Sequence, residues 1–155
     1  HLFNHDSKMI NPLTLVSSSG SDAVIALDQS NYQPHSTTAL FDALHEAINI
    51  ICMEVDALKN NKGKKPEIII GLMTDGLDNV SSRYNASDIK SLMNDLNNEG
   101  VIKNSVIIGW TNSNDLNEQH LINLKDEIGF NEYLALNQDP KSIREGFNLW
   151  SQRAI

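Results

Sequence analysis

Several features that would place a protein in a particular class are scarce in this sequence. Cys52 is the only cysteine among the 155 residues, so no disulfide can form within the chain and a reducing compartment is permitted. Hydrophobic runs are short, as at Ile68–Ile70, and none is long enough to span a bilayer. Basic residues are outnumbered, and the formal net charge of −8 argues against nucleic acid as the main partner.

Motifs typical of phosphate-binding and nucleophilic enzymes are missing as well. The sequence contains no Gly-x-Gly-x-x-Gly or Walker loop and no Asp-x-Asp pair. Cys52 lies in an apolar helical pattern, which predicts a small core residue rather than a catalytic thiol. These absences argue against an enzyme.

What the sequence does contain is an ordinary globular composition with alternating strand and helix signals. Hydrophobic residues make up 40% and charged residues 21%, and the length suits one domain. Alternation of strands and helices indicates a mostly parallel sheet covered by helices. We therefore predict a three-layer, Rossmann-like α/β fold, with a doubly wound sheet and helices on both faces. The predicted strands are the one that ends at 2–3 and those at 23–27, 67–73, 105–110 and 132–136, and the predicted helices are 38–58, 87–99, 115–128 and one that opens at Asp139-Pro140.

The composition of each predicted strand indicates its place in the sheet. Residues 67–73 form a nearly continuous apolar run, which predicts a strand that is buried on both faces. We expect this strand and the strand at 105–110 in the interior of the sheet. The strand at 132–136 is expected nearer an edge.

The predicted helices carry apolar residues on one side. In residues 38–58 these residues repeat at spacings of three and four for five turns, so the helix should lay one stripe on the sheet. In the last helix Asp139 is predicted to be the N-cap. Its inward face is expected to consist of Ile143, Phe147 and Trp150.

Two polar segments lie where doubly wound sheets bind ligands, at the carboxyl ends of strands. The first is residues 32–44, a polar loop that leads into the long helix. The second is residues 71–79, where a buried strand runs into an acidic turn. Hydroxyl and carboxylate oxygens are the ligands that hard cations such as Mg²⁺ prefer, so the two segments are candidates for a cation site.

These segments resemble the von Willebrand factor type A (vWA) family. Thr74-Asp75-Gly76, which follows an apolar strand, resembles the last metal motif of the family. Residues 38–43 (Thr-Ala-Leu-Phe-Asp-Ala) resemble its middle motif, and residues 2–8 resemble the second strand and following turn of a bacterial branch. The order and spacing of the motifs match over nearly the whole chain.

The resemblance implies a metal-ion-dependent adhesion site in which Thr38 and Asp75 are ligands. The implied cation is Mg²⁺, with Mn²⁺ or Ca²⁺ as alternatives. The family's remaining motif, Asp-x-Ser-x-Ser at the end of its first strand, is expected to precede His1. Residues 1–155 are accordingly predicted to be a single vWA-like domain that lacks its first strand and helix. The segment Asp28-Gln29-Ser30 lies too close to Thr38 to be that motif.

A missing central strand would have energetic consequences. Its neighbours would lose backbone partners, and each unpaired buried group costs roughly 1–3 kcal/mol. We therefore expect that the chain alone is not a stable monomer with an open gap. Metal affinity should be weak, because only Thr38 and Asp75 remain of the motif.

Each candidate ligand also has a structural explanation. Asp75 could simply begin an Asp-Gly turn, and Thr38 could N-cap the long helix, which is compatible with metal ligation. Asp42 is predicted to be a helix-start charge. The less favoured candidates are Thr37 as a substitute for Thr38, and Asp78 and Ser82 as residues that would reach the cation through water.

The function implied by the resemblance is a non-enzymatic binding module. In the family, one coordination position of the cation stays open, and an Asp or Glu carboxylate of a partner protein fills it. One alternative is a metal-free structural or interaction scaffold. Another is an enzyme of Mg²⁺-dependent phosphoryl transfer, with Asp75 as a metal ligand.

Overall fold

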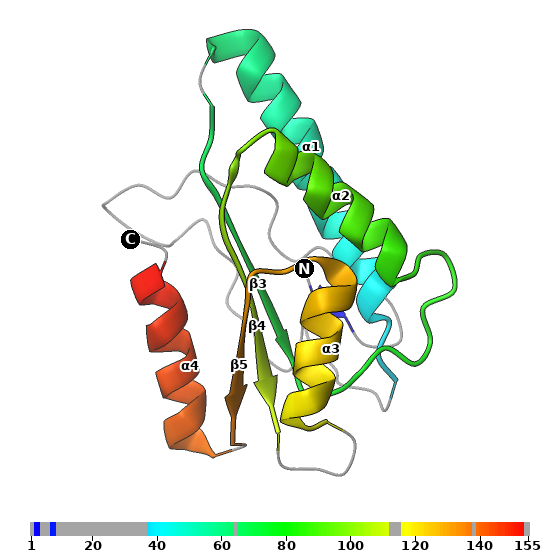
Figure 1. Cartoon of the computed structure of the whole chain (residues 1–155), viewed down its shortest axis with the longest axis vertical. Helices are drawn as coiled ribbons and strands as arrows, with labels where there is room; N and C mark the ends of the chain where they lie inside the picture. The colour runs from blue at the N-terminus through cyan, green and yellow to red at the C-terminus, as the bar shows by residue number, and fades with distance from the viewer. Residues whose placement is uncertain are drawn as a thin grey trace.

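A computed structural model describes residues 2–3, 7–8, 37–63, 65–111, 116–137 and 139–153. The strands are β1 (Leu2–Phe3), β2 (Ser7–Lys8), β3 (Ile68–Thr74), β4 (Ile102–Trp110) and β5 (Glu132–Leu136). The helices are α1 (Leu40–Lys62), α2 (Ala86–Asn98), α3 (Glu118–Ile128) and α4 (Pro140–Arg153) (Figure 1). The predicted strand at 23–27 and the segment Asp28-Gln29-Ser30 lie outside the described residues.

The sheet is parallel, as the alternation of strands and helices predicts. Its order is β3-β4-β5. Leu72 of β3 pairs with Ile107 of β4, which in turn pairs with Tyr133 of β5. β1 and β2 form a separate antiparallel pair that contacts α1.

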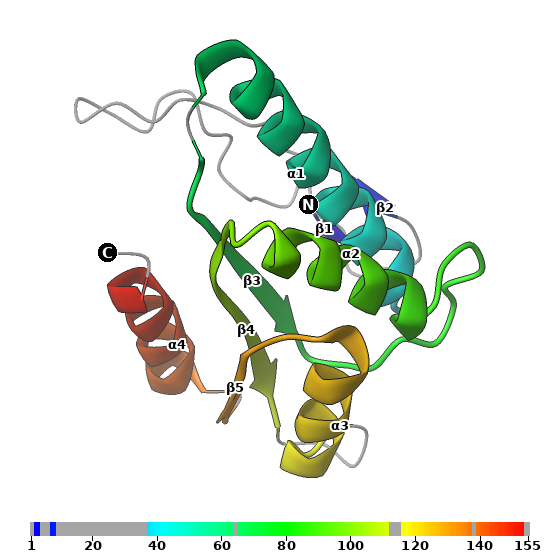
Figure 2. The ribbon, with the colours of Figure 1, turned by 45° about the horizontal axis from the view of Figure 1, so that its top comes forward.

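Helices lie on both faces of the sheet, which confirms the predicted three layers. Figures 1 and 2 show α1, α2 and α3 on one side of the strands and α4 on the other. α2 connects β3 to β4 and α3 connects β4 to β5. The two crossovers therefore cover the same face, and the carboxyl ends of the three strands meet at one edge. In the described part of the chain no helix is long and apolar enough to cross a membrane.

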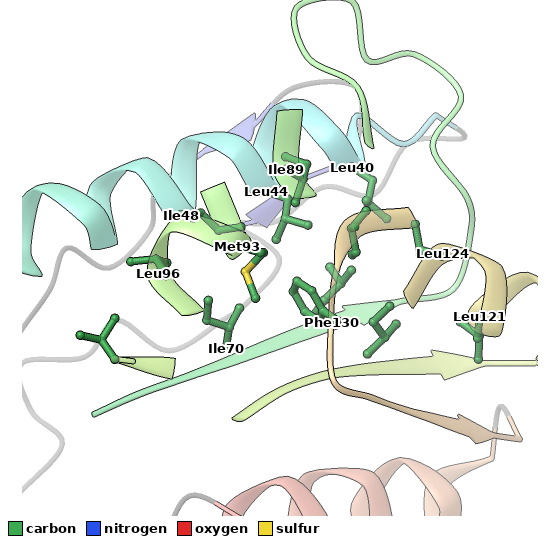
Figure 3. Close-up of a cluster of buried hydrophobic side chains, with 14 of the residues drawn as sticks. Leu40, Leu44, Ile48, Ile70, Ile89, Met93, Leu96, Leu121, Leu124 and Phe130 are labelled. Carbon is green, nitrogen blue, oxygen red and sulfur yellow. The ribbon is translucent and has the colours of Figure 1, made fainter. Parts of the chain in front are cut away.

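The hydrophobic core lies between the sheet and the three helices on that face (Figure 3). The predicted stripe of α1 is confirmed, since Leu40, Leu44 and Ile48 are buried in this core. Cys52 packs against the core, as predicted, but it is half-buried rather than a residue of the core itself. Burial raises the pKa of its thiol, and the negative charges of three nearby carboxylates raise it further.

The prediction that β3 is an interior strand buried on both faces is wrong for the described residues. β3 stands at the end of the three-stranded sheet, and β4 is the strand between two others. On β3, the side chains of Ile70 and Leu72 are buried, whereas Gly71 between them is exposed. The reason is that the core packs on one face only at this strand, while α4 on the opposite face contacts β5. An apolar run does not reveal which face is covered.

α4 begins as predicted, but one residue of its predicted inward face is exposed. The Asp139 carboxylate accepts hydrogen bonds from the backbone N–H groups of Lys141 and Ser142, both at 3.0 Å, which confirms it as the cap. Ile143, predicted to face inward, is 37% exposed, and the side chains of Phe147 and Trp150 lie outside the described part.

Among the described side chains of α4, a close contact with the sheet is made at a glycine. Gly146 is buried, and a Cβ added to it would lie 2.6 Å from Leu136 Cδ1 and 3.5 Å from Ile108 Cγ2. The helix therefore approaches β5 closely at Gly146, whereas Ile143 one turn earlier is partly exposed.

Candidate cation site at the carboxyl edge of the sheet

Asp75 lies at the tip of the turn that follows β3. The buried Thr74 hydroxyl closes this turn, because it donates a hydrogen bond to the Gly76 carbonyl at 2.7 Å and accepts one from the Gly76 N–H at 3.2 Å. Asp75 itself is exposed, and no residue in the described ranges forms a hydrogen bond or ion pair with its carboxylate. The turn thus presents a carboxylate at the carboxyl edge of the sheet.

Thr38 is tied to the loop between β3 and α2. Its N–H donates to the Asn79 side-chain carbonyl at 2.7 Å, and the Asn79 N–H donates to the Thr38 carbonyl at 3.0 Å. The Thr38 hydroxyl lies over Gly76, where an added Cβ would be 3.5 Å from Thr38 Oγ1. The structure therefore brings Thr38 beside the residue that follows Asp75.

Thr38 is not the N-cap of the long helix, which was the structural explanation considered for it. The N-cap is Ala39, and its side chain can make no capping hydrogen bond. The loop after β3 supplies the cap instead, because Asp78 Oδ1 accepts from the Phe41 N–H at 3.2 Å and Ser81 Oγ accepts from the Asp42 N–H at 3.0 Å. The amides two and three positions into a helix are the ones that an N-cap side chain ordinarily satisfies. The cap of α1 is therefore tertiary, and the Thr38 hydroxyl is not used for it.

Asp42 is more than a charge at the start of a helix. It lies in the first turn of α1, as predicted, but it is only 5% exposed. Asp42 Oδ1 accepts from the N–H groups of Arg83 at 3.1 Å and Tyr84 at 3.0 Å, and Oδ2 accepts from the Ser82 N–H at 3.3 Å. Three consecutive amides of the loop thus converge on one carboxylate.

The environment of Asp42 favours its charged form. Burial alone would raise the pKa of the carboxyl, but the backbone N–H groups of Ser82, Tyr84 and Arg83 and the Arg83 guanidinium outweigh it, and the pKa lies below the ordinary value of 3.8. Arg83 Nε lies 3.3 Å from Asp42 Oδ2, and its Nη1 lies 2.7 Å from Glu46 Oε1.

A stacked aromatic pair strengthens the attachment of the same loop to α1. The rings of His45 and Tyr84 lie 3.5 Å apart at an interplanar angle of 5°. The Arg83 guanidinium carbon lies 5.8 Å from the centre of the Tyr84 ring, within the range of a cation–π contact. Asp42, His45 and Glu46 of α1 therefore hold the loop at residues 82–84.

Two of the predicted cation ligands suit a hard cation. The Thr38 hydroxyl and the Asp75 carboxylate are oxygen donors, and the reciprocal bonds to Asn79 place their two segments side by side. Asp78 already accepts hydrogen bonds from Phe41 and Ser81, which makes it part of the cap. Within the described ranges there is no cluster of three His, Cys, Asp or Glu residues that could hold a metal. Oxygens from other sources must complete the coordination sphere of any cation bound here.

Sequence reasoning missed the residues that assemble this site. Asn79 and Ser81 were not singled out, and Asp42 was interpreted only as a local charge. The only available signal was the density of polar residues from Asp78 to Asn85 directly after an apolar strand. Such a run indicates a loop, and it does not show which helix the loop will cap.

Comparison with known proteins adds no assignment. No protein-family model matches the sequence, and no curated protein matches it.

Proposed function

We propose that the chain is a protein-binding module that engages an acidic partner group through a divalent cation held by Thr38 and Asp75. One observation carries this proposal. The Thr38 hydroxyl lies against Gly76, the residue that follows the exposed Asp75 at the carboxyl edge of a parallel sheet. That edge is where doubly wound sheets bind ligands.

The chemistry of the two donors fits Mg²⁺ better than a softer metal. Mg²⁺ and Ca²⁺ take oxygen ligands, and Mg²⁺ ordinarily keeps several waters when a protein supplies only one or two carboxylates. A cation held by one hydroxyl and one carboxylate would retain positive charge and exchangeable water. A partner's Asp or Glu carboxylate could replace one of these waters, and the cation would then bridge two proteins.

The test is a calorimetric titration of Mn²⁺ and Mg²⁺ into the chain. The expected result is weak saturable binding that is abolished by Asp75→Asn. Asp95→Asn is the matched control, because Asp95 is an exposed carboxylate on α2 and the chemical change is the same. Equal loss of binding in both variants, or no binding by the unaltered chain, would contradict the proposal. The second result would favour a metal-free scaffold.

Binding of an acidic partner should depend on the cation. A short acidic peptide should bind in the presence of Mn²⁺ and dissociate on addition of a chelator, because its carboxylate needs the cation. Its amidated counterpart, with Asn and Gln in place of Asp and Glu, should not bind. Mg²⁺-dependent hydrolysis of phosphate esters that is lost in Asp75→Asn would favour the phosphoryl-transfer alternative instead.

A further inference from the structure

Asp42 holds four consecutive residues of the loop that follows β3. Its N–H donates to Ser81 Oγ, and its carboxylate accepts from the N–H groups of Ser82, Arg83 and Tyr84. All four contacts come from a residue that is only 5% exposed. The Asp42 carboxylate takes no part in the hydrogen bond by which Asp78 caps α1, or in the hydrogen bond between Thr38 and Asn79.

The connections of this loop run on toward the candidate cation site. Ser81, which accepts from Asp42, donates in turn to Asp78 Oδ1, and that oxygen also accepts from the Phe41 N–H. The neighbouring Asn79 is the residue that holds Thr38. Asp42 holds residues 81–84 of the loop. As a consequence, residues 78–79 of the same loop stay in contact with the start of α1.

We propose that Asp42 is a positioning residue of the candidate site. It does not touch the cation. It fixes the loop at 81–84, and through Asp78 and Asn79 it keeps Thr38 against Gly76 and next to Asp75. The part of this inference that concerns metal affinity rests on the proposed function, and the part that concerns the loop does not.

The contacts require an aspartate at this position. An ionised carboxylate only accepts hydrogen bonds, and it can accept several. An asparagine would turn an NH₂ group toward at least one N–H donor of the loop. A glutamate would add a methylene group to a buried site whose partners are backbone amides. Neither substitute reproduces the arrangement.

The first experiment measures amide hydrogen exchange by NMR in the metal-free chain. In Asp42→Asn, the amides of residues 82–84 should lose protection, and so should the amide of Thr38. The control is Ile48→Val, or Ile48→Ala where a larger effect is needed, chosen to lower the melting temperature equally, since Ile48 is a core residue of the same helix. Unchanged protection of Thr38 in Asp42→Asn would overturn the proposal.

The second experiment compares Mn²⁺ affinity in the same variants, well below their melting temperatures. Asp42→Asn should weaken binding by about 10-fold or more, as substitutions behind metal ligands commonly do, whereas the Ile48 variant should bind like the unaltered chain. Equal affinity in Asp42→Asn and the unaltered chain would overturn the positioning role. If the unaltered chain binds no Mn²⁺, the proposed function fails, and the exchange experiment alone decides the role of Asp42.

Discussion

Thr38 and Asn79 hold each other by two hydrogen bonds although 41 positions separate them in the chain. The pair joins the residue before the N-cap of α1 to the loop after β3. Because Asp75 lies in the turn at the start of that loop, this bond decides whether the two candidate cation ligands are neighbours.

Asn79→Ala should loosen Thr38. The substitution removes the acceptor of a 2.7 Å hydrogen bond while the backbone bond from Asn79 to Thr38 can persist. We expect a loss of about 1 kcal/mol in the free energy of unfolding and weaker Mn²⁺ binding. Denaturant unfolding and calorimetry measure the two effects. Asn94→Ala on the exposed side of α2 is the control and should change neither.

Asp42→Ala should be one of the most destabilising changes to a polar residue in the described part of the chain. It leaves the N–H groups of Ser82, Arg83 and Tyr84 without their acceptor at a partly buried position. The expected loss in the free energy of unfolding is about 3 kcal/mol. Asp88→Ala, which removes a partner of the partly exposed cap of α2, should cost less. An Asp42 variant as stable as the Asp88 variant would contradict this account.

The contribution of Asp42 should depend on pH with a definite sign. The pKa of Asp42 is lowered in the folded chain, so the folded state favours the ionised form. Its stabilising effect is therefore fully present above the ordinary carboxyl pKa of 3.8, and it is lost as the pH falls from there through the lowered pKa. The difference in unfolding free energy between the unaltered chain and Asp42→Asn should be constant at neutral pH and shrink below about pH 4. A difference that grows on acidification would show that the sign is wrong.

Gly109→Ala should disrupt the packing of α3 on β4. An added Cβ would lie 2.6 Å from Leu121 Cδ1, and Leu121 is fully buried and has little room to move. We expect a loss of about 1–3 kcal/mol in unfolding free energy. Leu121→Ala removes the overlapping atoms, so the double variant should lose less than the sum of the single variants. Additive losses in this double-mutant cycle would contradict the packing argument.

The sequence by itself determined the parts of the fold that depend on nearby residues. The apolar stripe of α1, the Asp139 cap of α4 and the strand at Glu132–Leu136 follow from periodicity and local hydrogen bonding. Gly129, which directly follows the predicted helix at 115–128, has a φ of 75° as the C-cap of α3. The alternation of these elements was enough to predict a parallel α/β sheet, because short strands joined by helices have few other ways to bury their apolar faces.

Only the tertiary structure decided how the candidate site is built. The cap of α1 comes from Asp78 and Ser81, and Asp42 binds a loop about forty positions away. Such bonds join residues that are far apart in the chain, so no local pattern contains them. Local patterns also could not predict the burial of β3 or the contact at Gly146. Both depend on which helix packs on each face of the sheet. Residue type indicated which side chains could bind a cation or form hydrogen bonds, and packing decided which of them lie close together.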